Sequence, residues 1–153
     1  MKKQNVLFLC TGNSARSQMA EALLRRQAGD VFDSYSAGTE PKGVNPLTVQ
    51  VLSEIGIDTD ELRSKGVEEF LGRLPVRYLI VVCGDAGQKC PTVWPGVHQR
   101  MFWPFDDPAA ARGSEDDRLV LFREVRDRID ERLRQWRDEL RQSGEISLPA
   151  THS

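Results

Sequence analysis

A cysteine opens a run of residues suited to binding and attacking an oxyanion. The run is Cys10-Thr11-Gly12-Asn13-Ser14-Ala15-Arg16-Ser17, directly after the apolar residues 6–9. Successive backbone amides ahead of a helix can surround an anion, and the Arg16 guanidinium is a planar fork of donors that matches a tetrahedral oxyanion. The same positive field is expected to lower the pKa of the Cys10 thiol. We therefore predict a nucleophilic cysteine with an anion-binding loop at 11–17; the alternative is a buried cysteine before an ordinary turn.

The segments around this loop alternate between strands and helices. Strands are expected at 6–10, 32–37, 76–83 and 97–103, and helices at 14–28, 47–55 and 116–141, with one or two helical turns at 67–71. In the last helix, apolar residues recur every three or four positions and charged residues fill the rest. Asn45 is expected to cap the second helix, with Pro46 at its first position. This alternation predicts an α/β, three-layer domain with a short, about four-stranded parallel sheet flanked by helices.

Length and charge limit the possible classes of function. The 153 residues predict one domain over 1–142 and a disordered tail at 143–153. A net charge of −2 does not favour binding to nucleic acid or to an anionic membrane. The apolar runs are too short for a signal peptide or a membrane span, so a cytoplasmic protein is expected. Nothing in the sequence demands more than a monomer, so a monomer is expected. His98 and His152 lie in no metal-ligand spacing, so no metal is expected.

Two further cysteines follow the strongest predicted strand. Cys83 ends that strand as Cys10 ends the first, so both sulfurs are expected at the carboxyl edge of a parallel sheet. Cys90 follows seven residues later; in a regular helix the Cα atoms of Cys83 and Cys90 would be about 10 Å apart, beyond the ~7 Å that a disulfide allows. Gly84 and Gly87 would let this segment unwind. The spacing suggests a relay in which Cys10 attacks an oxyanion, Cys83 then bonds to Cys10, and Cys90 takes over the bond. Alternatively, Cys83 is a core residue and Cys90 an inert loop thiol.

The residues from 6 to about 134 resemble a known family. The resemblance rests on residues 10–21, on Ser36-Ala37-Gly38, on Gly43-Val44-Asn45-Pro46, on Cys83 and Cys90 with Pro91, and on Phe105-Asp106-Asp107-Pro108-Ala109. In these features the chain resembles the thioredoxin-coupled arsenate reductases, which share the fold of low-molecular-weight protein tyrosine phosphatases. The anion loop alone is common to both groups, whereas the pair Cys83 and Cys90 at this spacing resembles the reductases.

The resemblance implies reduction of arsenate to arsenite. Cys10 would be the nucleophile, Ser17 would support its thiolate, and Asp107 would be the general acid that protonates the departing oxygen. The disulfides Cys10–Cys83 and Cys83–Cys90 would form in turn. Thioredoxin is the reductant that the family implies, with glutaredoxin or a low-molecular-weight thiol left open.

Two departures from the family pattern stand out. Many such reductases bind potassium near the loop; Asn13, Glu21 and Ser36 match that site, but 63–65 is Arg-Ser-Lys where the family has Thr-Ser-Asp, so we expect no potassium requirement. Ala109 and Ala110 stand where the phosphatases carry tyrosines. A phosphatase using Cys10, Arg16 and Asp107 remains the main alternative. A redox or anion-sensing module without turnover is a third reading, which the proton donor Asp107 disfavours.

Overall fold

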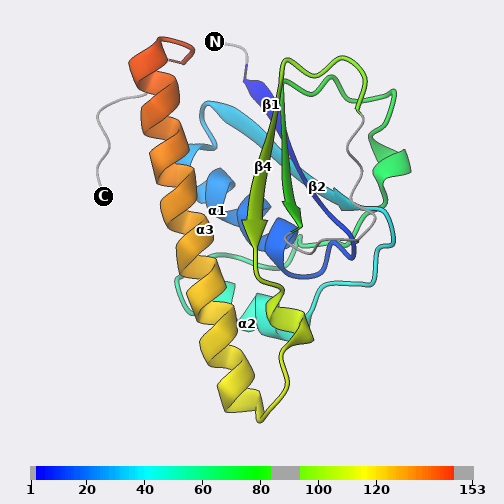
Figure 1. The fold of residues 1–153 in the computed structure, drawn as a ribbon, viewed down its shortest axis with the longest axis vertical. Coiled ribbons are helices and arrows are strands. Elements are labelled where there is room, and N and C mark those ends of the chain that lie inside the picture. Colours follow the sequence, from blue (N-terminus) through cyan, green and yellow to red (C-terminus); the bar gives the residue numbers. More distant parts are fainter. Residues whose placement is uncertain (1–2, 84–93, 147–153) are drawn as a thin grey trace.

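A four-stranded parallel sheet forms the centre of the protein, whose computed structural model describes residues 3–83 and 94–146 (Figure 1). Its strands, in spatial order, are β2 (Phe32–Gly38), β1 (Gln4–Cys10), β3 (Tyr78–Cys83) and β4 (Gln99–Phe105). The helices are α1 (Arg16–Ala28), α2 (Pro46–Ser53) and α3 (Glu115–Ser143), with short 3-10 helices η1 (Val67–Glu69) and η2 (Pro108–Ala110). The predicted α/β class and parallel four-stranded sheet are confirmed.

The two central strands bring the cysteines to one edge of the sheet. All six residues of β3 are buried, and so are the last five of β1, as expected for strands covered on both faces. The two strands pair in parallel, with Leu9 opposite Val81. Cys10 and Cys83 therefore both end their strands at the carboxyl edge, as predicted.

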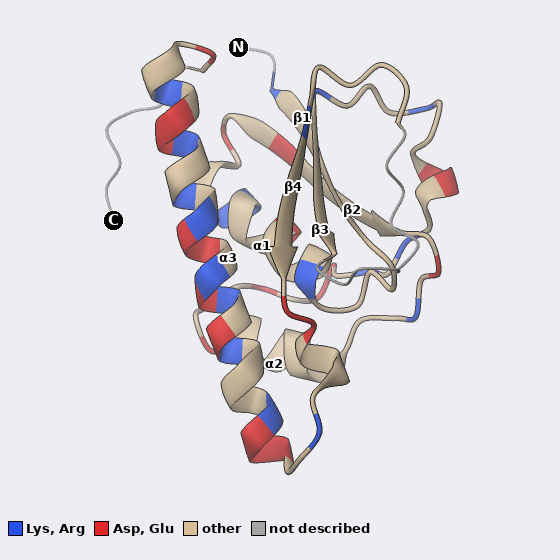
Figure 2. Ribbon diagram, viewed as in Figure 1, with Lys and Arg blue, Asp and Glu red and all other residues tan. Residues whose placement is uncertain are grey.

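Helix α3 covers one face of the sheet through an aromatic cluster. The Trp136 ring lies 5.3 Å from the ring of Phe32, 5.2 Å from that of Tyr78 and 5.7 Å from that of Trp103, between ring centres. These three partners come from β2, β3 and β4, so α3 packs against three strands of the sheet through Trp136. Figure 2 shows acidic and basic residues alternating along α3, consistent with the predicted apolar stripe and charged outer face.

The other face of β2 carries side chains that point away from α3. Neighbouring residues of a strand point to opposite faces, and the Tyr35 ring packs 5.5 Å from that of Phe70, which follows η1. The residue after η1 thus packs against this face of β2. His98 lies on the surface before β4 and packs edge-on against Tyr78. Within residues 3–83 and 94–146, no group of three or more His, Cys, Asp or Glu side chains is placed so that it could hold a metal ion.

Several boundaries differ from the predicted ones. Helix α1 begins at Arg16, because Ser14 and Ala15 belong to the anion loop. The predicted disordered tail is wrong for residues 143–146: Ser143 ends α3, Gly144 closes it in the left-handed conformation at φ 77°, and Ile146 is buried against the core. The cap of α2 is confirmed, since the Asn45 side chain accepts from the Leu47 amide. Within the described ranges, no helix is long and apolar enough to cross a bilayer.

Candidate active site

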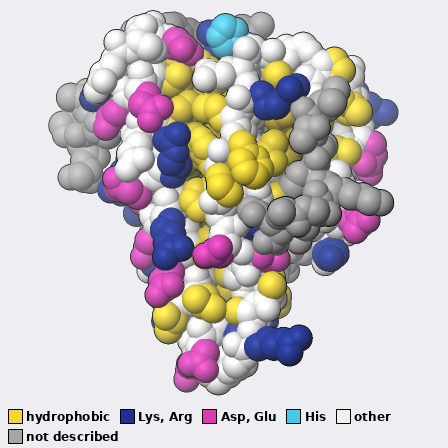
Figure 3. All heavy atoms as spheres, viewed as in Figure 1, with side chains coloured by type: hydrophobic (Ala, Val, Ile, Leu, Met, Phe, Trp, Pro, Cys, Tyr) yellow, Lys and Arg dark blue, Asp and Glu magenta, His cyan; other side chains and the backbone are white. Residues whose placement is uncertain are grey.

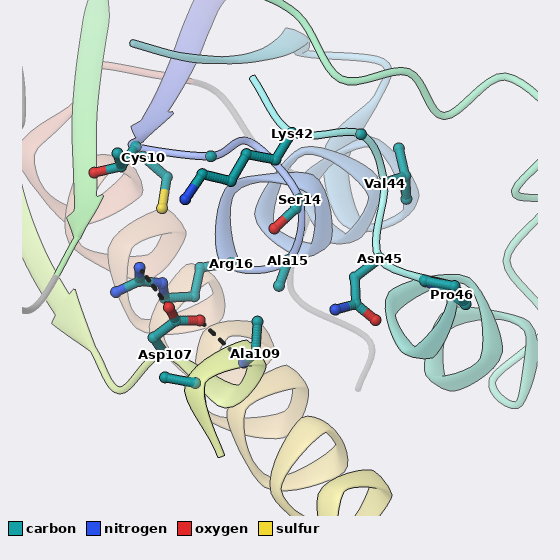
Figure 4. Close-up of a pocket in the computed structure, with 14 residues that line it drawn as sticks. Cys10, Ser14, Ala15, Arg16, Lys42, Val44, Asn45, Pro46, Asp107 and Ala109 are labelled. Atoms are coloured by element: carbon teal, nitrogen blue, oxygen red, sulfur yellow. Dashed lines mark hydrogen bonds and ion pairs between the residues drawn. The ribbon is translucent and has the colours of Figure 1, made fainter. Parts of the chain in front are cut away.

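The Cys10 thiol lies in a cavity of about 450 Å³ at the carboxyl edge of the sheet (Figure 4). Strand β1 delivers this cysteine, and only 4 % of it is exposed. The lining comes from the anion loop, from the segment before α2 and from η2: Cys10, Thr11, Gly12, Ser14, Ala15, Arg16, Lys42, Gly43, Val44, Asn45, Pro46, Asp107, Ala109 and Ala110. The structure therefore brings the predicted nucleophile, loop, arginine and acid together.

Backbone hydrogen bonds hold the anion loop with its carbonyl groups turned outward. The carbonyls of Thr11, Gly12 and Ser14 accept from the backbone amides of residues 40, 42 and 45, at 2.9, 2.9 and 3.0 Å. Gly38 must be a glycine, because a Cβ there would lie 2.5 Å from the Thr11 carbonyl oxygen. On the inner side, the amides of Thr11 and Gly12 donate to the Cys10 sulfur. The loop thus presents N–H groups to the cavity, as an oxyanion requires.

Asn13 is the internal brace of the loop. It adopts φ 46°, a left-handed conformation that asparagine tolerates better than most residues. Its side chain is buried; Oδ1 accepts from Gln18 Nε2 at 2.9 Å and from the Lys65 amide at 2.8 Å, and Nδ2 donates to Ser17 Oγ at 2.7 Å. Ser17 is therefore held by Asn13, and its support of a thiolate stays a prediction. Gln18 lies within residues 10–21, but the residue types of that motif do not predict its bracing role.

Arg16 and Asp107 face each other across the cavity. Arg16 is buried; Nη2 lies 3.7 Å from Asp107 Oδ2, and Nη1 donates to the Phe105 carbonyl at 3.0 Å. Its Nε is buried with no hydrogen-bond partner among the described residues. Asp107 also caps η2, since Oδ1 accepts from the Ala109 amide at 3.0 Å. A buried donor without a partner beside the loop amides is what a site awaiting an oxyanion should contain.

The pKa of Cys10 contradicts the prediction from the sequence. Burial raises the pKa of the thiol above its ordinary value of 9.0, and the Asp107 carboxylate adds to the rise. Arg16 and the amides of Thr11 and Gly12 act in the opposite direction but do not outweigh burial. The expected lowering is therefore wrong for the anion-free site, because the loss of water disfavours the thiolate more than the positive field favours it.

Cys83 lies next to the backbone that carries Cys10. Its Sγ is 3.9 Å from the Leu9 carbonyl oxygen and 3.9 Å from Thr11 Oγ1, on either side of Cys10 in the chain. Cys83 is disulfide-bonded and Cys10 is a free thiol, so the bond between these two cysteines is not formed here. Cys90 lies outside the described residues, and so does the predicted Cys83–Cys90 pair.

A buried ammonium lies behind the loop, among the residues that match the family's potassium site. Lys65 is 8 % exposed, and its Nζ contacts Glu21 Oε1 at 3.2 Å, Ser36 Oγ at 3.4 Å and the Arg63 carbonyl at 2.7 Å. Burial lowers the pKa of Lys65, whereas the Glu21 carboxylate opposes that shift. The Arg63 guanidinium pairs instead with Glu69 at the surface. Of the two cations that were expected near this position, only Lys65 points inward.

Comparison with known proteins agrees with this geometry. The family described as low molecular weight phosphotyrosine protein phosphatase matches residues 5–145. An arsenate reductase of Bacillus licheniformis is 44% identical over 137 residues, which are 89% of this chain and 96% of that protein. The solved structure of a thioredoxin-dependent arsenate reductase of Corynebacterium glutamicum has a TM-score of 0.69 at 29% identity, over 92% of this chain and 63% of that one. A low molecular weight protein tyrosine phosphatase from T. tengcongensis, at 21% identity, has a TM-score of 0.71 over 90% of this chain and 100% of that one, which shows the shared fold.

Proposed function

Because the chain belongs to the low molecular weight phosphotyrosine protein phosphatase family, and within it to the arsenate reductases, we propose that it reduces arsenate to arsenite through a three-cysteine relay. The observation that carries this proposal is the position of the Cys83 sulfur, 3.9 Å from the carbonyl of Leu9, which precedes the nucleophile Cys10. Hydrolysis of a phosphate ester needs one nucleophilic sulfur and no redox partner, so a phosphatase does not require a second sulfur at this position.

The proposed steps balance in atoms and electrons. The proton of the Cys10 thiol passes to the arsenate, the resulting thiolate attacks arsenic, and one arsenate oxygen leaves as water with a further proton that Asp107 takes up from solvent and delivers. Cys83 then attacks the Cys10 sulfur; the electron pair of the sulfur–arsenic bond stays on arsenic, which departs as arsenite, and a Cys10–Cys83 disulfide forms. Cys90 next attacks the Cys83 sulfur and frees Cys10. An external dithiol reduces the Cys83–Cys90 bond and returns the three thiols.

We propose thioredoxin as that dithiol, acting in the reducing cytoplasm. Hydrophobic side chains gather over the face that β4 crosses (Figure 3), and Phe102 of β4 is 61 % exposed. Strand β4 pairs with β3, in which Cys83 lies opposite Phe105. An exposed aromatic on the strand next to a redox cysteine supports contact with a partner protein at this place.

We also propose that the protein works as a monomer without a metal or potassium. The ammonium of Lys65 already contacts Glu21, Ser36 and the Arg63 carbonyl, oxygen atoms of the kind that would hold a monovalent cation. A second cation there would meet the charge of Lys65 at close range.

Thiol counting tests the relay. The fully reduced protein, given excess arsenate and no reductant, should lose two of its three thiols and release one arsenite, whereas phosphate in place of arsenate should cause no loss. Cys90→Ser should also complete one turnover and then hold the Cys10–Cys83 disulfide, which peptide mapping would detect. Cys83→Ser should release no arsenite.

The same variants separate the reductase from the phosphatase. If Cys90→Ser continued to turn over with thioredoxin, the order of the relay would be wrong. If arsenate oxidised no thiols while aryl phosphates were hydrolysed steadily, unaffected by Cys83→Ser, the protein would be a phosphatase acting through Cys10, Arg16 and Asp107.

A further inference from the structure

The segment before α2 brings a second basic side chain to the mouth of the cavity. Its Lys42 amide donates to the Gly12 carbonyl, so the backbone at this position is fixed to the anion loop. The aliphatic stem of Lys42 lies over Gly12, with Cδ 3.5 Å from where a Cβ on that glycine would be. Figure 4 shows the side chain extending from this segment toward Cys10 and not away into solvent.

The charges of the lining show why this position matters. Arg16 faces Asp107 at 3.7 Å and also donates to the Phe105 carbonyl, so much of its charge is already balanced inside the protein. The Cys10 thiol is protonated, as its raised pKa requires, and adds no charge. Arg16 and Asp107 together therefore leave the cavity close to neutral. Lys42 is the further cation of the lining, and among the described residues no carboxylate lies within ion-pair distance of its ammonium.

We propose that Lys42 is an oxyanion-binding residue that supplies the net positive charge of the site. A dianionic tetrahedral oxyanion, such as arsenate or phosphate, would lie between the loop amides and Arg16 on one side and the Lys42 ammonium on the other. A flexible lysine at the mouth can follow the anion inward, where an ammonium–oxygen hydrogen bond is charge-assisted. The cavity thereby favours small dianions over neutral or singly charged ligands.

This inference deepens the proposed function, because it concerns the same anion site, but it can be tested without any redox chemistry. Inorganic phosphate is the probe, and its dissociation constant is measured by calorimetry on the reduced full-length protein. Lys42→Met should weaken phosphate binding about tenfold, which corresponds to 1.4 kcal/mol, and Lys42→Arg should restore most of the affinity. For arsenate, KM should rise in Lys42→Met by a larger factor than kcat falls.

Arg73→Met is the matched control, because it removes one exposed positive charge that does not belong to the cavity lining. Phosphate binding in this variant should stay within twofold of the wild type. The inference is overturned if Lys42→Met also stays within twofold, or if Arg73→Met weakens binding as much as Lys42→Met does. Should the wild type bind phosphate through Lys42 yet lose no thiols with arsenate, the proposed reductase function fails and the role of Lys42 stands.

Discussion

Replacing Lys65 by methionine removes the cation buried behind the anion loop. The Glu21 carboxylate, 5 % exposed, would then keep Ser36 Oγ at 2.7 Å and Arg25 at 3.0 Å as partners. Removing one member of a buried ion pair costs about 3–5 kcal/mol of unfolding free energy. We expect the lower end, about 3 kcal/mol, because Arg25 still compensates Glu21. In a domain of this size that is a fall in Tm of about 6–12 °C.

Thermal and urea unfolding of three variants measure this effect. Lys65→Met is compared with the double variant Lys65→Met/Glu21→Gln, which no longer buries the Glu21 carboxylate and should recover part of the loss. Arg63→Met is the control, since its ion pair with Glu69 is exposed and should be worth less than about 1 kcal/mol. All are measured in potassium, sodium and choline chloride at equal ionic strength.

Two results would refute this reasoning. One is a Lys65→Met protein as stable as Arg63→Met, which would mean that the buried pair contributes no more than the exposed pair. The other is a wild-type protein that gains stability in potassium but not in sodium or choline, since Lys65 is proposed to make an added cation unnecessary. The expected outcome is that the wild type has the same Tm in all three salts.

Other predictions concern single groups. Because burial raises the folded-state pKa of Cys10 above 9.0, the folded protein holds this proton longer than the unfolded chain; the resulting stability is present below pH 9.0 and falls as pH rises through the folded-state pKa. Alkylation of anion-free Cys10 by iodoacetamide, followed by mass spectrometry, should have its midpoint above pH 9.0, and a midpoint below it would contradict the raised pKa. Arg16→Lys should weaken phosphate binding, measured by calorimetry, because an ammonium cannot reproduce the guanidinium fork. Ser114→Ala should cost about 1 kcal/mol in urea unfolding, since Ser114 and Asp117 form a capping box at α3; an unchanged midpoint would deny the cap any role.

Features that depend on local sequence could be predicted well. The order of strands and helices follows from apolar periodicity, and the meeting of Cys10 and Cys83 follows from parallel strands that share a carboxyl edge. The cap at Asn45 is a local hydrogen bond and was predicted from neighbouring residue types. The predicted end of α3 at residue 141 is too early, since the helix continues to Ser143, although Gly144 supplies a local signal for its left-handed cap.

Features that depend on tertiary burial could not be predicted in the same way. The pKa of Cys10 depends on how much water the folded site excludes, and the motif shows the positive field but not the burial. The sequence predicts that Lys65 repels a metal ion, but it does not predict that Lys65 is buried against Glu21. These two residues are 44 positions apart, and no spacing rule reveals a contact between them. Lys42 stands directly before the Gly43-Val44-Asn45-Pro46 motif, so the sequence indicates its position, but the direction of its side chain depends on the loop that it covers.

The raised pKa of Cys10 is compatible with nucleophilic chemistry when the substrate is counted as part of the site. A neutral thiol beside a doubly charged arsenate holds the same number of protons as a thiolate beside a singly charged one. Transfer of the Cys10 proton to the oxyanion would therefore create the nucleophile and a better leaving group in one step, with Arg16 and Lys42 stabilising the remaining charge. On this argument the anion-free thiol stays protected from adventitious oxidation, since the thiolate is the reactive form. Phosphate should accordingly change the pH at which Cys10 is alkylated, whereas a variant lacking Arg16 should show no such change.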